Sequence, residues 1–378
     1  MNVVVFASDA KGLSSLNSII EELNKQGHHL FAMVTQETQL RHPIHQKTDY
    51  QILCNVPRIN KWFSNTLQEQ IPFEADWLII NRERWNPENI IIEEFRSRGT
   101  KIALVEPNAW LLNGAESRLE TYSRNRWADK IDIFFMGSKH GIDQQKAAGF
   151  IGNMVSVGNP KYDLNIKVPS KHLEHLKEGY GVSNDKENIL LFSLVNGHRN
   201  NLNKIFIKYV EDQNKRFFYK PYPGEPFDSK YAKDYIPNFF LPSTTPILDE
   251  KHIWGMFELC DTHIGVISSI VHATLLKGKK YIDCSLELNL PEKVLDFSGV
   301  FQEDGSGLEN NKSMWMNSFG FNHISQLKEL LPDSYKDHIK EINQRVWDNL
   351  DNPKVLLTLF DDYNDGNAAK RIVDELQK

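Results

Sequence analysis

The stretch THIGVISSIVHATLLKGKKYIDC, residues Thr262–Cys284, is the clearest indication of fold class in this chain. A short apolar strand, His263–Ile267, is followed by the serine pair Ser268-Ser269. A helix, Ile270–Lys277, comes next and ends at Gly278, and a second apolar strand follows at Lys280–Asp283. A strand–turn–helix–strand unit of this kind is typical of a parallel sheet. The sequence therefore predicts an α/β fold.

Ser268 and Ser269 fall where the carboxyl end of the first strand meets the helix. Free backbone N–H groups and the positive end of the helix dipole attract anions at such a position, and two hydroxyls add donors. The arrangement suits a phosphate; the alternative is that Ser268 only caps the helix. His272 lies one turn into the helix, where it either reaches a bound nucleotide or packs in the core.

Alternating strands and helices continue through the rest of the chain. The amino-terminal half has apolar runs between amphipathic segments at Val3–Ala7, His29–Thr35, Asp76–Asn81, Lys101–Val105, Ile131–Met136 and Met154–Val157. Such runs indicate a sheet covered on both faces. The pattern restarts with strands at Asn188–Leu194 and Arg216–Tyr219, and the chain ends in helical segments.

We therefore predict two Rossmann-like domains, in residues 1–165 and residues 185–352. We expect further helices in residues 353–378, and the linker at Asn165–Asn184. Two such domains present the carboxyl ends of both sheets to a cleft between them, where ligands bind. The first domain lacks a GxGxxG turn, which does not favour a dinucleotide.

Composition and charge argue against several classes of function. A net charge of −6 over 378 residues argues against a broad nucleic-acid surface. The three cysteines are dispersed singly, which indicates buried thiols in a reducing compartment rather than a zinc site or disulfides. We see no signal peptide and no apolar run of membrane-spanning length. We expect a cytoplasmic protein and leave open a peripheral contact with the inner face of the membrane.

Two loops of the predicted second domain carry anion-binding chemistry. In KPYPGE (Lys220–Glu225), Lys220 can pair with a phosphate, Gly224 allows close approach, and Glu225 can accept from ribose or sugar hydroxyls. Tyr222 stands between the two prolines. The alternative is a proline-stiffened loop with a solvated lysine.

The second loop is the turn after the first strand of the second domain. There, Asn196 and Arg199 could meet a pyrophosphate, the alternative being a simple turn.

The predicted first domain offers two carboxylates at strand ends. Glu106 follows strand Lys101–Val105 and Asp9 lies in the turn after the first strand, so either could act as general base on an acceptor hydroxyl. For Glu106 the alternative is a capping or interdomain acid. Acceptor-binding candidates are Arg82, Arg84 and His140; such arginines also form salt bridges, and a histidine at a helix start is often on the surface.

Four motifs in sequence order resemble those of bacterial GT-B glycosyltransferases and CDP-glycerol glycerophosphotransferases, a group that also includes sialyl- and Kdo-transferase-like enzymes. GNPKYD, KPYPGE, ISSIVHATLLKGK and GNAAKRIVDEL resemble that group's G-N/Y-P-R-x-D turn, K-x-H-P-x-E loop, S-S-x-x-x-E-A-x-x-x-G-K helix and final D-G-x-A-A-x-R-I helix. The motifs span most of the chain. The signature of the related UDP-sugar 2-epimerases is not evident.

The resemblance implies a GT-B fold, in which residues 1–165 form an acceptor domain and residues 185–352 a domain that holds a nucleotide-activated donor. It also implies that the helices of residues 353–378 pack back toward the first domain. It places Lys220, Tyr222, Ser268 and Ser269 near the donor phosphate and the acceptor with its base in the first domain. Two positions depart from the pattern: Tyr222 stands where a histidine is usual, and His272 where a glutamate is usual. A tyrosine hydroxyl donates to phosphate but brings no positive charge.

Our hypothesis is a metal-independent glycosyltransferase that moves a sugar from a nucleotide-activated donor to a glycan or lipid-linked acceptor in bacterial capsule or lipopolysaccharide synthesis. No DxD element lies near a strand end, and we expect no cofactor beyond the donor substrate. One alternative is a polyol-phosphate transferase using a CDP-polyol donor. The other is a non-catalytic partner that binds nucleotide sugars.

Overall fold

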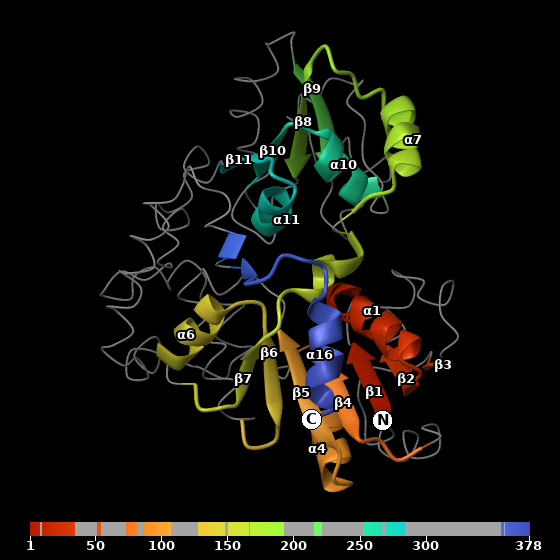
Figure 1. Cartoon of the computed structure of the whole chain (residues 1–378), viewed down its shortest axis with the longest axis vertical. Helices are drawn as coiled ribbons and strands as arrows, with labels where there is room; N and C mark the ends of the chain where they lie inside the picture. Colours follow the sequence, from red (N-terminus) through yellow and green to blue (C-terminus); the bar gives the residue numbers. More distant parts are fainter. Residues whose placement is uncertain are drawn as a thin grey trace.

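The computed structural model (Figure 1) shows an α/β protein with two parallel sheets. It describes residues 1–7, 10–34, 51–53, 73–81, 86–106, 128–147, 150–165, 167–192, 215–220, 252–265, 270–283, 357–358 and 360–378. Within these ranges, no helix has the length and apolar character needed to cross a bilayer.

Among the described residues, the first sheet has seven strands in the order β3-β2-β1-β4-β5-β6-β7, and every pairing is parallel. The strands are β1 (Asn2–Ala7), β2 (His29–Val34), β3 (Gln51–Leu53), β4 (Trp77–Ile80), β5 (Lys101–Glu106), β6 (Ile133–Met136) and β7 (Met154–Ser156). The strand order reverses between β1 and β4. In doubly wound sheets, ligands bind outside the carboxyl ends of the strands at such a reversal.

Helices cover both faces of this sheet. Along β1, Val3 and Val5 join one buried cluster, whereas Val4 and Phe6 join another on the opposite face, because successive side chains of a strand alternate. The first face carries α1 (Ala10–Lys25) and α16 (Ala368–Leu376), which lie side by side. The second face carries α4 (Asn86–Ser97), and α6 (Lys139–Ala147) packs beside β6 and β7.

The second sheet, as far as the structure describes it, has four parallel strands in the order β11-β10-β8-β9. They are β8 (Glu187–Phe192), β9 (Lys215–Lys220), β10 (Thr262–Gly265) and β11 (Lys280–Asp283). Its helices are α7 (Ser170–Tyr180), α10 (Ile253–Leu259) and α11 (Ile270–Leu276). Among these strands, the order reverses between β8 and β10.

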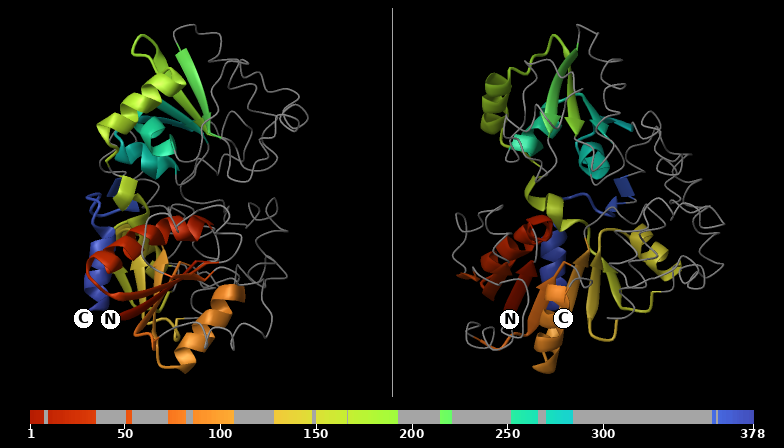
Figure 2. Two further views of the ribbon diagram at one scale, coloured as in Figure 1. Left: turned by 90° about the vertical axis from the view of Figure 1, so that its right-hand side faces the viewer. Right: turned by 180° about the vertical axis from the view of Figure 1, so that it is seen from behind.

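Within the described residues, two segments of the chain run between the two sheets. After β7 it passes through the 3-10 helix η3 (Pro160–Asn165) and α7 into the second sheet. The segment from Phe360 onward returns to the first sheet and ends in α16, as Figure 2 shows from two sides. The carboxyl ends of the strands in both sheets point toward this crossing region. We call Val157–Asp163 the crossover segment and Phe360–Asn367 the return segment.

The predicted α/β class is confirmed, and most predicted strands match the observed ones to within two residues. Two differences have physical reasons. Strand β3 was not predicted, because three residues carry too little periodicity to detect. The stretch predicted as linker holds α7, whose Leu176 is buried against Gly255 of α10; the charged residues around Leu176 hid this apolar side.

Candidate functional site

Lys220 is the described member of the predicted donor loops. It is the last residue of β9 and pairs in register with Phe192, the last residue of β8. Its side chain is buried, with 7% exposure, at the edge of the sheet that faces the crossing region. Several other donor candidates lie outside the described residues, in the segments after β8, β9 and β10: Asn196, Arg199, Tyr222, Gly224, Glu225, Ser268 and Ser269.

The acceptor candidates follow strands of the first sheet. Glu106 is the last residue of β5 and is in register with Met136 at the end of β6. His140 is the second residue of α6, directly after β6, and is buried rather than on the surface. Asp9, Arg82 and Arg84 lie outside the described residues, Asp9 after β1 and both arginines after β4.

His272 is wholly buried, and its described ring contacts come from the crossover and return segments. The ring lies edge-on to Tyr162, with centroids 4.4 Å apart, and stacks on Phe360 at 5.1 Å. Its Nδ1 atom is 3.4 Å from the Nδ2 atom of Asn159. Burial lowers the pKa of His272 to about 3, opposed in part by the side chain of Asn364. The imidazole is therefore neutral at neutral pH.

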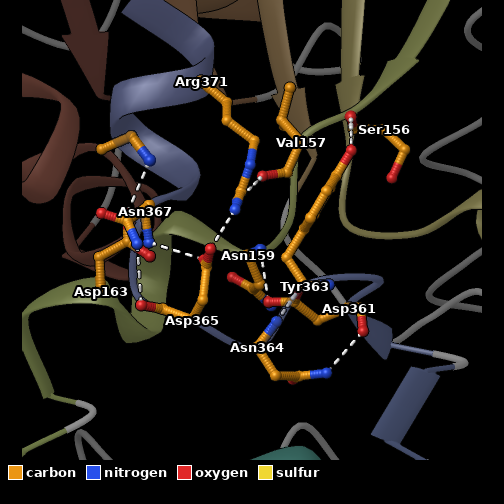
Figure 3. Close-up of polar contacts among 11 residues, drawn as sticks. Ser156, Val157, Asn159, Asp163, Asp361, Tyr363, Asn364, Asp365, Asn367 and Arg371 are labelled. Carbon is orange, nitrogen blue, oxygen red and sulfur yellow. Dashed lines mark hydrogen bonds and ion pairs between the residues drawn. The ribbon is translucent and has the colours of Figure 1, made fainter.

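Asp361 ties the return segment to the crossover segment (Figure 3). Its Oδ2 atom accepts from the backbone N–H of Asn159 at 2.9 Å. Its Oδ1 atom accepts from the backbone N–H groups of Tyr363 and Asn364, at 2.8 and 2.9 Å. Burial raises the pKa of Asp361, and the three hydrogen bonds oppose that shift.

Gly158 is required where these two segments meet. Its φ is +88°, and a Cβ atom on it would lie 3.0 Å from Oδ1 of Asp361. A side chain would therefore meet both backbone strain and the carboxylate.

The start of α16 is fixed by a second aspartate of the crossover region. Asp163 accepts from the backbone N–H of Ala369 at 2.6 Å through Oδ2. Burial raises the pKa of Asp163 to about 6, against the effect of the backbone hydrogen bonds. Arg371, one turn further along, donates to the carbonyl of Val157 at 3.1 Å and pairs with Asp365.

Sequence reasoning gave no role to Asn159, although it lies in the motif GNPKYD, and did not single out Asp361. They are 202 residues apart, and no local pattern pairs them. No group of three His, Cys, Asp or Glu side chains suited to a metal ion occurs in the part of the chain that the structure describes. Metal-independent chemistry stays a prediction from the sequence.

Comparison with solved structures identifies the architecture. The chain superposes on the UDP-GlcNAc 2-epimerase of Neisseria meningitidis bound to UDP-GlcNAc, with a TM-score of 0.58 and 11% identity over 100% of both chains. It superposes on TagF, a wall teichoic acid polymerase soaked with CDPG, with a TM-score of 0.54 and 12% identity over 100% of this chain and 88% of that one. For a glycosyltransferase from Rickettsia africae the TM-score is 0.53, with 12% identity over 100% and 98% of the chains.

These similarities confirm the predicted GT-B fold, in which two Rossmann-like domains face each other. No protein-family model and no curated protein matches the sequence.

Proposed function

We propose that this protein is a glycosyltransferase that moves a sugar from a nucleotide-activated donor to a glycan or lipid-linked acceptor in bacterial capsule or lipopolysaccharide synthesis. The observation that carries the proposal is Lys220, a buried cation at the carboxyl end of β9, next to the end of β8. That edge is where a doubly wound sheet binds ligands. Structures of the same fold hold UDP-GlcNAc in one case and were soaked with CDPG in another.

On the donor side, Lys220 would stabilise the negative charge that develops on the leaving nucleotide. Ser268 and Ser269 follow β10, the strand on the other side of β8, and their hydroxyls would donate to the same phosphate. Fixed cationic and hydroxyl donors of this kind stabilise a leaving group without a metal ion. Tyr222, Asn196 and Arg199 would line the nucleotide, with Gly224 and Glu225 beside the sugar.

On the acceptor side, Glu106 or Asp9 would take the proton from the acceptor hydroxyl. The oxygen would then attack the anomeric carbon of the donor sugar. The bond from that carbon to the phosphate oxygen would break, and the electron pair would leave with the nucleotide. Arg82, Arg84 and His140 would orient the acceptor.

A second candidate is transfer of a polyol phosphate from a CDP-polyol, favoured by the likeness to TagF. The same base would activate the acceptor hydroxyl, whose oxygen would attack the phosphorus that carries the polyol. CMP would leave with the electron pair of the broken P–O bond. The anion site proposed around Lys220 would serve both reactions.

Nucleotide binding and product analysis test the proposal. We expect one class of CMP-, CDP-, UDP- or GDP-linked donor to raise the melting temperature of the full chain. Turnover with an acceptor should release a nucleoside diphosphate from UDP- or GDP-sugars, and CMP from a CMP-sugar or CDP-polyol. Activity should persist in the presence of a chelator. Binding without turnover would favour the non-catalytic alternative, and epimerised UDP-sugar without an acceptor would contradict transfer.

A matched pair of lysine variants on β9 sharpens this test. Lys220→Met should weaken donor binding roughly 10- to 100-fold, the usual effect of losing a charge-assisted hydrogen bond. Lys215→Met, at the amino end of the same strand, should leave binding unchanged. The melting temperatures of both variants without nucleotide identify any loss caused by misfolding. Equal binding by both variants would contradict the assignment of Lys220.

We also propose that the enzyme acts in the cytoplasm, with a peripheral contact at the inner face of the membrane where lipid-linked acceptors reside. Co-sedimentation of the purified chain with anionic vesicles measures that contact.

A further inference from the structure

Helix α11 has two polar anchors on opposite sides of a domain boundary. Inside its own domain, the Thr274 hydroxyl lies 2.8 Å from Nδ1 of His263 on β10, and both side chains are buried. The second anchor is His272, which reaches Asn159 of the crossover segment. One side of the helix is therefore bonded to its sheet, and the other to the chain that joins the two domains.

The Asn159 amide is held in a defined orientation. Its Oδ1 atom accepts from the backbone N–H of Lys161 at 3.1 Å, so its Nδ2 atom faces the imidazole of His272. An amide nitrogen only donates, and Nδ1 of His272 must therefore accept, which requires a neutral ring protonated at Nε2. The backbone N–H of Asn159 is bonded to Asp361, so the contact continues into the return segment.

Aromatic contacts enclose the same ring. Tyr162 of η3 lies edge-on to it, and Phe360 of the return segment stacks on it with an interplanar angle of 28°. Both elements belong to the region where the chain crosses between the sheets. The ring and hydrogen-bond contacts described above for His272 therefore all come from the crossover and return segments.

We propose that His272 is a positioning residue, which fixes the orientation of α11 relative to the crossover and return segments through Asn159. Helix α11 follows the serine pair assigned to the donor phosphate, so the effect on donor binding rests on the proposed function. The contact between His272 and Asn159 does not rest on that function. Because of this contact, the position of α11 depends on how the two domains are arranged.

Three variants of the full chain separate this role from others. His272→Phe keeps an aromatic ring between Tyr162 and Phe360 but removes the acceptor. His272→Asn restores an acceptor close to the position of Nδ1. Thr274→Val removes the anchor within the domain and leaves the His272 contact in place.

Amide hydrogen exchange without nucleotide is the first measurement. In His272→Phe, exchange should rise roughly 3- to 10-fold in both α11 and the crossover segment, the effect of one lost buried hydrogen bond. His272→Asn should reverse most of that rise. In Thr274→Val, exchange should rise in α11 while the crossover segment stays unchanged. Unchanged exchange of the crossover segment in His272→Phe would overturn the proposal.

Donor affinity, measured by calorimetry with UDP and CDP, is the second measurement. His272→Phe should weaken binding by a similar factor, and His272→Asn should restore it. If His272→Phe loses binding while exchange of the crossover segment stays at the wild-type level, the ring contacts the nucleotide directly and the positioning role is wrong. If the wild-type chain binds no nucleotide, the proposed function fails, whereas the exchange data still decide whether the contact between His272 and Asn159 exists.

Discussion

The two sheets are built alike, but their cores are completed in different ways. The core of the first sheet includes Ile372 and Val373 of α16, a helix that follows the second sheet in sequence. The core of the second sheet includes Tyr162 of η3, which precedes that sheet. Each core thus takes a piece from one of the two segments that cross between the domains. Side chains from the connecting parts of the chain are therefore buried in both domain cores, and a substitution where the chain crosses should lower the stability of both domains.

Tyr162→Ala should have the largest effect, because the side chain is buried and its ring contacts both Trp254 and His272. Replacing a large buried aromatic residue by alanine costs about 3–5 kcal/mol. Denaturant unfolding measures the loss. Tyr162→Phe, which keeps the ring, is the matched control and should retain most of the stability. A loss confined to the first sheet would contradict the assignment of Tyr162 to the second core.

Ile372→Ala tests the other core. Ile372 is fully buried between α16 and the first sheet, and a buried Ile→Ala change costs about 2–5 kcal/mol. Hydrogen exchange should increase in β1 and β4 more than in β8 and β10. Lys370→Ala on the exposed side of the same helix should change stability by less than about 0.5 kcal/mol. Equal loss of protection in both sheets would show that the domains unfold as one unit.

The pH dependence of Asp163 gives a smaller effect at the crossing itself. Burial raises its pKa from 3.8 to about 6, so the folded protein binds this proton more tightly than the unfolded chain does. The contribution to stability is therefore fully present below pH 3.8 and is lost as the pH rises through about 6. Relative to Asp163→Asn, which does not titrate, wild-type stability should fall by on the order of 1–3 kcal/mol over this range. A difference independent of pH would contradict the burial of this carboxyl group.

Trp77→Phe should have the smallest effect. The indole Nε1–H of Trp77 donates to the carbonyl of Leu376 at 3.0 Å, which joins β4 to the end of α16. Losing one such bond costs about 0.5–1.5 kcal/mol. The thermal midpoint should fall slightly, with faster exchange at the last turn of α16. A change larger than that of Ile372→Ala would mean that this hydrogen bond, rather than apolar packing, holds the helix.

The sequence predicts the strands better than the connections between them. The run Val3–Ala7 is apolar throughout because both faces of β1 are covered, and the predicted strand matches β1 to within one residue at each end. The prediction of a charged linker misses α7, because Leu176 is the one fully enclosed side chain of this helix. Hydrophobic periodicity detects broad apolar faces and misses a helix that buries so little.

The same difference applies to the candidate site, where a strand end was predictable and contacts between distant segments were not. The pattern of the chain placed Lys220 at a strand end, because the aromatic run Phe217–Tyr219 directly precedes it. The contact between Asn159, His272 and Asp361 could not be predicted, because it joins three distant segments by single hydrogen bonds and ring contacts. Such pairings are determined by the tertiary fold and leave no periodic signal.

The packing of α16 on the first sheet has a consequence for biosynthesis. A ribosome makes this helix only after both sheets have been translated, so the nascent first domain spends most of synthesis with an apolar face unfilled. Surfaces exposed in this way are targets for chaperones and for aggregation. A premature stop shortly before Ala368 would leave that state permanent, even though every strand of both sheets would have been made.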